Sequence, residues 1–224
     1  MSGKKVIITG ATGMVGGCAL KICLANPDVS MVTAIGRSPT GVDDAKLQEV
    51  LVDDFVDYGA LRWALENQDT VLFCLGAYTG AVPDDLFRRI TVDYTLAFGN
   101  ALQEASPQAA FCFLSGQGAD QAEKSRMAFA RYKGAAETAL LNMGFARVHI
   151  FRPGYIYPVT PRREPNLMYT ISRVLYPLLR LIYPNIGIAS EDLAAAMVHV
   201  GLYGTGDIQG PILENKDIRT MQRL

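Results

Sequence analysis

Short, unbroken apolar runs alternate with helical stretches along the chain. Runs such as VIIT at residues 6–9 and TVLFCLG at 70–76 lack a polar residue at every second position, so both faces of these strands should be buried. The predicted strands span residues 4–9, 30–36, 47–52, 70–76, 109–115, 146–154 and 211–215. The predicted helices span residues 13–25, 57–66, 84–105, 123–143 and 191–200, the last with Ser190 as its N-cap.

Helices between fully buried strands predict a mainly parallel sheet in a doubly wound, Rossmann-like α/β fold. We find no repeat and no linker, so residues 1–224 are expected to form a single domain. Only residues 155–190, rich in Tyr, Pro and Arg, break the rhythm, and they are expected to form a small substrate-side insertion near the C-terminus. Ligands in such a fold bind beyond the carboxyl ends of the strands.

Composition narrows the classes of function. The net charge of −1 and the scattered Lys and Arg residues do not predict a nucleic-acid-binding surface. The four cysteines lie in apolar segments without metal-ligand spacing, which favours reduced thiols and no metal site. The first residues show no signal peptide, so a cytoplasmic location is expected. Arg173, Pro177 and Arg180 interrupt the most apolar segment, which argues against a transmembrane helix.

A glycine-rich turn follows the first predicted strand, with the spacing Gly10-x-x-Gly13-x-x-Gly16. Glycines there permit a tight turn that brings backbone N–H groups and a helix N-terminus up to a pyrophosphate. The alternative is that the glycines only shape the turn. The predicted dinucleotide site in this segment comprises Gly10, Thr12, Gly13, Met14, Val15 and Gly16.

The stretch TGATGMVG resembles the dinucleotide motif of the extended and atypical short-chain dehydrogenase/reductases. Later stretches resemble the Tat-interacting-protein branch of that superfamily; they are CLGAYTGAVPDDLFRRITVDYTL, FLSGQGAD, KGAAETALLNMGFARVHIFRPGYIY and ILENKDIR. The resemblance implies an NAD(P)-binding Rossmann domain. It also implies three contacts with the cofactor: Asp54 and Phe55 beside the adenine, Leu75, Gly76 and Ala77 under the cofactor, and Pro153 and Gly154 near the nicotinamide.

The end of the second predicted strand, AIGRSP, bears on the choice of dinucleotide. An NAD site usually offers a carboxylate to the ribose hydroxyls there, whereas an NADP site offers a cation to the 2′-phosphate. Arg37 supplies a guanidinium and Ser38 a hydroxyl, and no carboxylate stands beside them. We therefore expect NADP(H), although Arg37 is also typical of an exposed loop.

Short-chain reductases use a Ser after the fifth strand and a Tyr-x-x-x-Lys pair on the next helix, and the resemblance places Ser115 and Lys133 in two of these roles. Phe129 stands where the proton-donating Tyr is expected. Loss of a positioned general acid typically lowers the rate by about 10²–10⁴-fold. Tyr132 is a substitute candidate, although an ordinary, partly buried tyrosine is the interpretation favoured for it. Other candidates, from loops at strand ends, are Tyr78, Tyr155 and Tyr157, although a place in the pocket wall is favoured for each. Lys133 is expected to bind the ribose.

Three functions remain open from the sequence. The first is an NADPH-dependent reductase of a small apolar or lipid-like carbonyl compound, with a non-standard active site. The second is a non-catalytic NADP(H)-binding protein that senses redox state or binds a protein partner. The third is an epimerase or dehydratase, for which the chain is short. The apolar surface of residues 155–190 suits a substrate or a dimer interface equally well.

Overall fold

The computed structural model describes residues 3–78, 80–159 and 184–221. Its centre is a parallel sheet of seven strands in the order β3-β2-β1-β4-β5-β6-β9. The strands are β1 (Lys4–Thr9), β2 (Val29–Gly36), β3 (Leu47–Leu51), β4 (Thr70–Phe73), β5 (Ala110–Leu114), β6 (Arg147–Arg152) and β9 (Ile212–Glu214). The strand order reverses between β1 and β4, so a ligand-binding crevice is expected at the carboxyl ends of these two strands.

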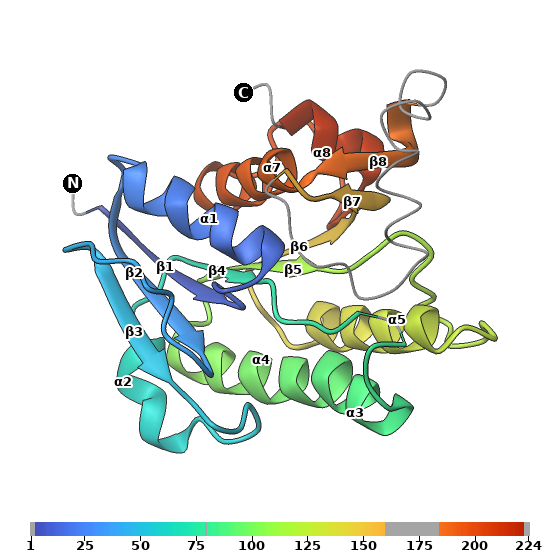
Figure 1. Ribbon diagram of the computed structural model, residues 1–224, viewed down its shortest axis with the longest axis horizontal. Helices are drawn as coiled ribbons and strands as arrows, with labels where there is room; N and C mark the ends of the chain where they lie inside the picture. Colours follow the sequence, from blue (N-terminus) through green and yellow to red (C-terminus); the bar gives the residue numbers. More distant parts are fainter. Residues whose placement is uncertain (1–2, 79, 160–183, 222–224) are drawn as a thin grey trace.

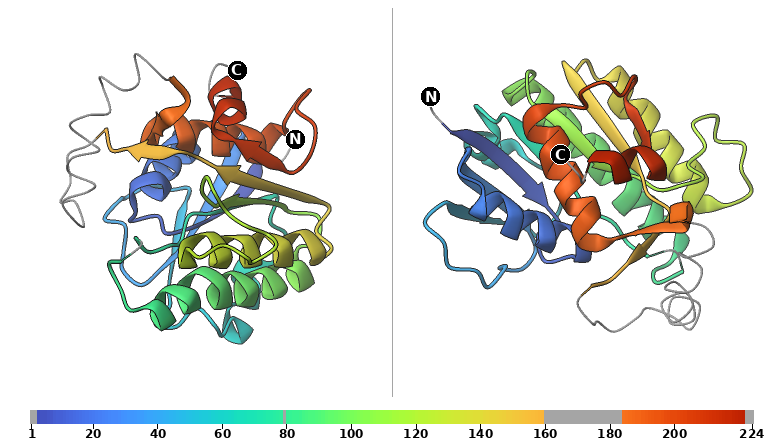
Figure 2. Two further views of the ribbon diagram at one scale, coloured as in Figure 1. Left: turned by 90° about the vertical axis from the view of Figure 1, so that its right-hand side faces the viewer. Right: turned by 90° about the horizontal axis from the view of Figure 1, so that it is seen from above.

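Helices cover both faces of the sheet (Figure 1). One face carries α1 (Met14–Ala25), α7 (Ser190–Tyr203) and α8 (Asn215–Met221). The other carries α2 (Arg62–Leu65), α3 (Asp84–Arg88), α4 (Tyr94–Ala105) and α5 (Ala128–Asn142). The two rotated views show the same three layers (Figure 2). The predicted doubly wound, Rossmann-like fold is confirmed.

The hydrophobic core is split by the sheet into two layers, as strand geometry requires. Successive side chains of β1 point to opposite faces, so Val6 and Ile8 pack with α1 and α7, whereas Ile7 packs with the helices of the other layer. All three are at most 1% exposed. The unbroken apolar strands of the sequence are therefore buried on both sides.

The helix predicted over residues 84–105 begins and ends as expected but is not uniform. Pro83 precedes its first residue, and Asp84 and Asp85 in the first turn favour the positive end of the helix dipole. A π-helical turn, Arg89–Asp93, separates α3 from α4. The predicted helix over residues 57–66 is likewise a 3₁₀ turn, Gly59–Leu61, followed by the short α2.

Two predicted helix starts are wrong. Helix α5 begins at Ala128 and not at residue 123, because the Asp120 carboxylate accepts hydrogen bonds from the backbone N–H groups of Ala122, Lys124 and Ser125 and holds a turn there. Ser190 is the first residue of α7 and not its N-cap, and its hydroxyl accepts a hydrogen bond from the Val159 N–H at 3.4 Å.

The region predicted as a substrate-side insertion contains a second, two-stranded parallel sheet of β7 (Tyr155–Tyr157) and β8 (Gly187–Ala189), with a 3₁₀ turn, Pro184–Ile186, before β8. Residues 160–183, with the apolar segment in question, lie outside the described residues. The sequence pattern did not predict β7, β8 or α8. Among the described helices, none is long and apolar enough to cross a membrane.

Candidate active site

The glycine-rich turn between β1 and α1 is shaped by close backbone contacts. Gly10 has a φ of +72°, a conformation that favours glycine, and a Cβ there would lie 2.8 Å from the Cys74 carbonyl oxygen. A Cβ on Gly13 would lie 2.9 Å from the Gly10 oxygen, and one on Gly16 would overlap that same carbonyl. The Gly13 N–H donates to the Gly10 oxygen at 2.8 Å. The three glycines thus allow this close packing of the turn.

This packing exposes the first turn of α1 to a ligand. Among the described residues, no side chain caps its N-terminus, and Gly13 precedes it with an extended backbone. The first backbone N–H groups of a helix lack intrahelical acceptors, and the helix dipole makes them an anion site. The turn can therefore hold the pyrophosphate of a dinucleotide.

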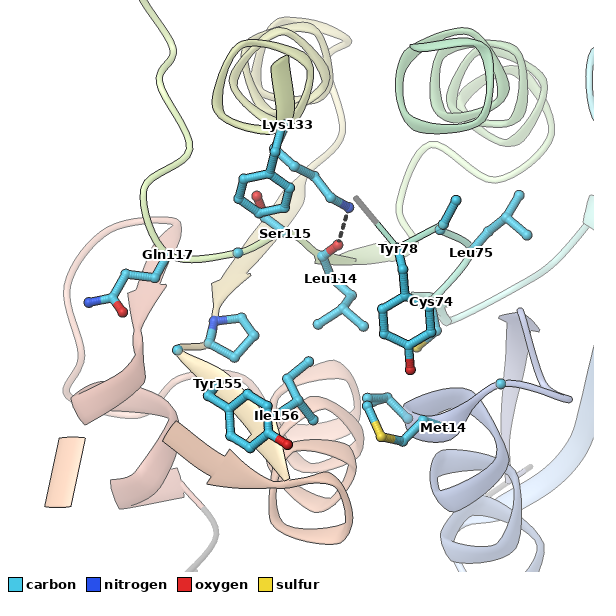
Figure 3. A pocket seen from close by; sticks show the side chains of 18 of the residues that line it. Met14, Cys74, Leu75, Tyr78, Leu114, Ser115, Gln117, Lys133, Tyr155 and Ile156 are labelled. Atoms are coloured by element: carbon cyan, nitrogen blue, oxygen red, sulfur yellow. Dashed lines mark hydrogen bonds between the residues drawn. The ribbon is translucent and has the colours of Figure 1, made fainter. Parts of the chain in front are cut away.

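A cavity of about 470 Å³ opens beside this turn, at the carboxyl ends of β1, β4, β5 and β6. Its walls are formed by residues 13–15, 74–78, 114–117, 129, 133, 153–156 and 158. In Figure 3, Lys133 reaches toward Leu114 on one side, Met14 and Tyr155 lie on the opposite side, and Tyr78 lies between them at the right. Segments far apart in the sequence thus meet at the edge where the fold is expected to bind a ligand.

Many of the predicted cofactor residues line this cavity, and they are Gly13, Met14, Val15, Leu75, Gly76, Ala77, Lys133, Pro153 and Gly154. Gly10 and Thr12 belong to the adjoining turn and Gly16 to the first turn of α1, all three outside the lining. Arg37 and Ser38 are exposed directly after β2.

The two residues expected beside the adenine, Asp54 and Phe55, follow β3 and do not line the cavity. The Asp54 carboxylate accepts a hydrogen bond from Arg89 Nη2 at 2.8 Å. Phe55 is 2% exposed and packs on the Tyr94 ring, with centroids 5.4 Å apart.

Of the predicted catalytic residues, Ser115, Phe129 and Lys133 line the cavity, whereas Tyr132 does not. The Ser115 hydroxyl donates to Glu137 Oε1 at 2.5 Å, so its proton is directed at a buried carboxylate. Tyr132 is outside the cavity lining, and its hydroxyl donates to Asp84 Oδ2 at 2.7 Å. The structure therefore does not bring Tyr132 to the cavity.

Phe129 lines the cavity with its ring against Gly116. A Cβ built on Gly116 would lie 2.6 Å from Phe129 Cζ, so the tip of the ring fills the space of a side chain at position 116. A tyrosine hydroxyl would be attached at this same Cζ atom. Phenyl ring and glycine together make this part of the wall apolar.

Lys133 presents a desolvated amine to the cavity. The residue is 8% exposed, and its Nζ donates to the Leu114 carbonyl oxygen at 2.7 Å and lies 4.6 Å from the centroid of the Phe113 ring. Burial lowers the pKa of this amine from 10.5 to about 8, and the negative charge of Glu137 opposes the shift. Lys133 is therefore partly deprotonated near pH 8.

Sequence reasoning missed the most connected polar group of the site. Glu137 is fully buried, one helical turn after Lys133 on α5, and it accepts hydrogen bonds from Ser115, Gln121 and Arg152. Arg152 holds it with two bonds, from Nε at 3.0 Å and Nη2 at 2.5 Å, and also donates to Glu214 Oε1 at 3.3 Å. The only sequence signal for its role was the spacing of four residues between Lys133 and Glu137, which places both on one face of a helix.

Asn215 was also missed, although it stands in the ILENKDIR stretch. Its side chain is buried; Oδ1 accepts from the Gly154 N–H at 3.0 Å, and Nδ2 donates to the carbonyl oxygens of Asn185 and Gly187. A Cβ on Gly154 would lie 2.6 Å from the Ile186 oxygen. Asn215 thus fixes the cavity wall that follows β6.

Metal and thiol chemistry gain no support from the described part of the chain. No group of three or more His, Cys, Asp or Glu residues there could hold a metal ion. The four cysteines are free thiols. Burial raises the pKa of Cys74, which lines the cavity, to about 12, so this thiol stays protonated at neutral pH.

The turn, the crevice and the sheet order define a dinucleotide-binding protein of the Rossmann type. A family described as NAD(P)H-binding matches residues 10–171. The chain belongs to this family.

The chain is 29% identical to "Protein HTATIP2" of Rattus norvegicus over 221 residues, which is 97% of this chain and 89% of that protein. It is 27% identical to "Protein fmp52, mitochondrial" of Emericella nidulans over 207 residues, covering 88% and 87% of the two chains. Among solved structures, the Bordetella bronchiseptica enzyme WbmG in complex with NAD aligns with a TM-score of 0.66 at 16% identity, over 99% of this chain and 78% of that one. The resemblance to the Tat-interacting-protein branch of the short-chain dehydrogenase/reductases is confirmed.

Proposed function

We propose that the protein binds NADP(H) in the cavity and is an oxidoreductase for a small apolar or lipid-like carbonyl compound. The observation that carries the proposal is the meeting of the uncapped α1 N-terminus, the 74–78 segment, Lys133 and Gly154 around one cavity of about 470 Å³. Leu75, Ile156 and Phe129 give this cavity an apolar character. When bound, the cofactor would supply hydride to a carbonyl carbon.

Side chains of the cavity would bind the ribose and donate a proton to the carbonyl oxygen. The Lys133 ammonium can hold the ribose hydroxyls, since it retains N–H donors besides the one directed at Leu114. The carbonyl oxygen must receive a proton, and neither Phe129 nor Ser115 is placed to give one. Tyr78 and Tyr155 line the cavity and are the hydroxyl-bearing candidates for this transfer.

The preference for NADP(H) over NAD(H) rests on Arg37 and Ser38 at the carboxyl end of β2. A guanidinium there can form charge-assisted hydrogen bonds with a 2′-phosphate. Calorimetry with NADPH and NADH tests the proposal. We expect tighter binding of NADPH, and Arg37→Ala should weaken NADPH binding by about 1.5–3 kcal/mol with little effect on NADH.

Arg62→Ala serves as the matched control, because Arg62 is a surface arginine on α2 paired with Glu66. It should leave both affinities unchanged. Equal affinity of the wild-type protein for the two cofactors would contradict the NADP(H) assignment. Binding of neither cofactor would contradict the whole proposal.

A non-catalytic NADP(H)-binding role is the second candidate, and two contacts favour it. Phe129 fills the space beside Gly116, and the Ser115 proton is directed at Glu137. Phe129→Tyr separates the two functions. If the wild-type protein binds NADPH without oxidising it against a panel of aldehydes and ketones, and Phe129→Tyr starts turnover, the natural protein is a cofactor-binding protein that has lost its acid. Ordinary wild-type turnover, unchanged in Phe129→Tyr, supports the reductase.

The cellular location is part of the proposal. Free thiols fit a reducing compartment, and we propose the cytoplasm. The fungal relatives named mitochondrial make the mitochondrion the alternative, which subcellular fractionation decides.

A further inference from the structure

Glu137 lies outside the cavity lining, yet its hydrogen bonds reach the segments that form the lining. Ser115 belongs to the wall after β5, and Arg152 immediately precedes the wall residues Pro153 and Gly154 after β6. Gln121 Nε2, from the loop that follows Ser115, donates to Glu137 Oε2 at 2.9 Å. Ser115, Gln121, Glu137 and Arg152 are called the Glu137 cluster below.

A fully buried carboxylate without partners would be strongly unfavourable, and this one is compensated by four hydrogen bonds, two of them from a guanidinium. No ligand is needed to explain it. Its place between two cavity walls and one turn from Lys133 therefore points to a role in shaping the site, and not to a second site.

We propose that Glu137 is the positioning residue of the cavity: it fixes Ser115 and Arg152 at the ends of β5 and β6, and its negative charge favours the ammonium form of Lys133. The cofactor part of this inference rests on the proposed function. The structural part stands on the contacts of the Glu137 cluster, and the electrostatic part on the position of Glu137 one helical turn after Lys133 on α5.

The surroundings of Lys133 leave Glu137 as its main counter-charge. From β5, the amine meets the Leu114 carbonyl and the Phe113 ring, which are uncharged. From the segment after β4 it faces Cys74, whose thiol is protonated at neutral pH. Burial lowers the pKa of the amine and the Glu137 carboxylate raises it, so removal of the carboxylate should lower the pKa of Lys133 further.

The test is the titration of Lys133, followed by the ¹³Cε chemical shift in protein labelled with [6-¹³C]lysine. The Lys133 signal is assigned as the one absent from Lys133→Met. We expect a wild-type midpoint near pH 8, and a midpoint lower by roughly one pH unit in Glu137→Gln. Glu214→Gln is the matched control, because Glu214 also binds Arg152 but is 42% exposed. It should leave the midpoint unchanged.

An unchanged or higher midpoint in Glu137→Gln would overturn the proposal. Because Glu137→Gln leaves Arg152 without its carboxylate, a second variant, Glu137→Met with Arg152→Met, removes both charges together and is expected to fold. The midpoint must fall in this variant too. If it does not, the carboxylate is not what keeps Lys133 charged.

A calorimetric arm connects the proposal to the cofactor. At pH 8, the fall in the ammonium population should weaken NADPH binding in Glu137→Gln by about fivefold, and less at pH 6. If the wild-type protein binds no NADPH, the proposed function fails, while the titration still decides the role of Glu137. If NADPH binding in Glu137→Gln matches the wild type at pH 8 despite a lower midpoint, the claim that Glu137 supports cofactor binding through Lys133 is wrong.

Discussion

Two connections face each other across the cavity, and they are built in different ways. In the β1–α1 turn, residues 10–13, backbone packs against backbone at Gly10 and Gly13, where a Cβ atom would crowd a carbonyl oxygen. The β5–α5 connection, residues 115–127, is held by polar side chains that reach Glu137 and by the turn around Asp120. The first offers N–H groups to any pyrophosphate. The second depends on two charged side chains, Glu137 of α5 and Arg152 of the neighbouring strand β6, so its stability depends on their ion pair.

The largest expected effect of a single substitution lies on the β5–α5 side. Arg152→Met should lower the free energy of unfolding by about 3–5 kcal/mol, because Glu137 is left as a buried charge without its guanidinium. Urea denaturation measures the loss. Glu214→Gln, which removes the exposed partner of the same arginine, should change stability by less than about 1 kcal/mol. Similar losses in the two variants would mean that the buried pair is not the main stabilising contact.

The pH dependence of stability is a second test of the β5–α5 side, through the buried amine of Lys133. The folded-state pKa of Lys133 is depressed to about 8 from 10.5, because burial disfavours the ammonium. The unfolded chain therefore binds more protons between these values, so this residue's destabilising contribution is fully present below pH 8 and is relieved as the pH rises toward 10.5. The full shift corresponds to about 3 kcal/mol.

Urea denaturation of wild type and Lys133→Met at pH 7 and pH 10 measures this contribution. The stability advantage of Lys133→Met should shrink at the higher pH. Lys124→Met, at an exposed position, is the control and should show no such trend. An advantage that grows with pH would contradict the sign of the shift.

On the β1–α1 side, the expected effect comes from sterics alone. Gly16→Ala should lower the free energy of unfolding by about 2 kcal/mol, since its methyl group would overlap the Gly10 carbonyl. Gly17 is the next residue of the same helix, and Gly17→Ala places its methyl group 3.2 Å from the Ala11 oxygen. This substitution should therefore lower the free energy of unfolding much less. Thermal unfolding compares the two. Equal losses would show that the turn tolerates a side chain and that its glycines have another role.

The smallest predicted effect concerns the contact between Gly116 and Phe129. Gly116→Ala should lower stability by about 1 kcal/mol in the natural protein, because the new methyl group meets Phe129 Cζ. In a Phe129→Leu background the loss should nearly vanish, and a double-mutant cycle measures the difference. Additive effects would mean that the ring moves aside freely.

The two connections also differ in how far the sequence could predict them. The strand β1, the glycine turn and α1 were predicted to within one residue because their signals are local: an apolar run, glycine spacing and a helical stretch. In the Glu137 cluster, Glu137 binds residues that are 15 to 22 positions away from it in the sequence. Nothing in its local sequence distinguishes Glu137 from a surface glutamate. Likewise, the resemblance placed Ser115 in the catalytic set, but only the folded structure shows that its hydroxyl donates to Glu137.

Asn215 has a consequence for the order in which the protein is made. Strand β9 and Asn215 leave the ribosome after the other strands of the sheet. Until then, the Gly154 N–H lacks its acceptor Asn215, and Arg152 lacks its second carboxylate, Glu214. During synthesis, β6 is therefore the unpaired edge of the nascent sheet, and the wall beyond it is unfinished. The cavity wall beyond β6 can be completed only after β9 and Asn215 have been synthesised.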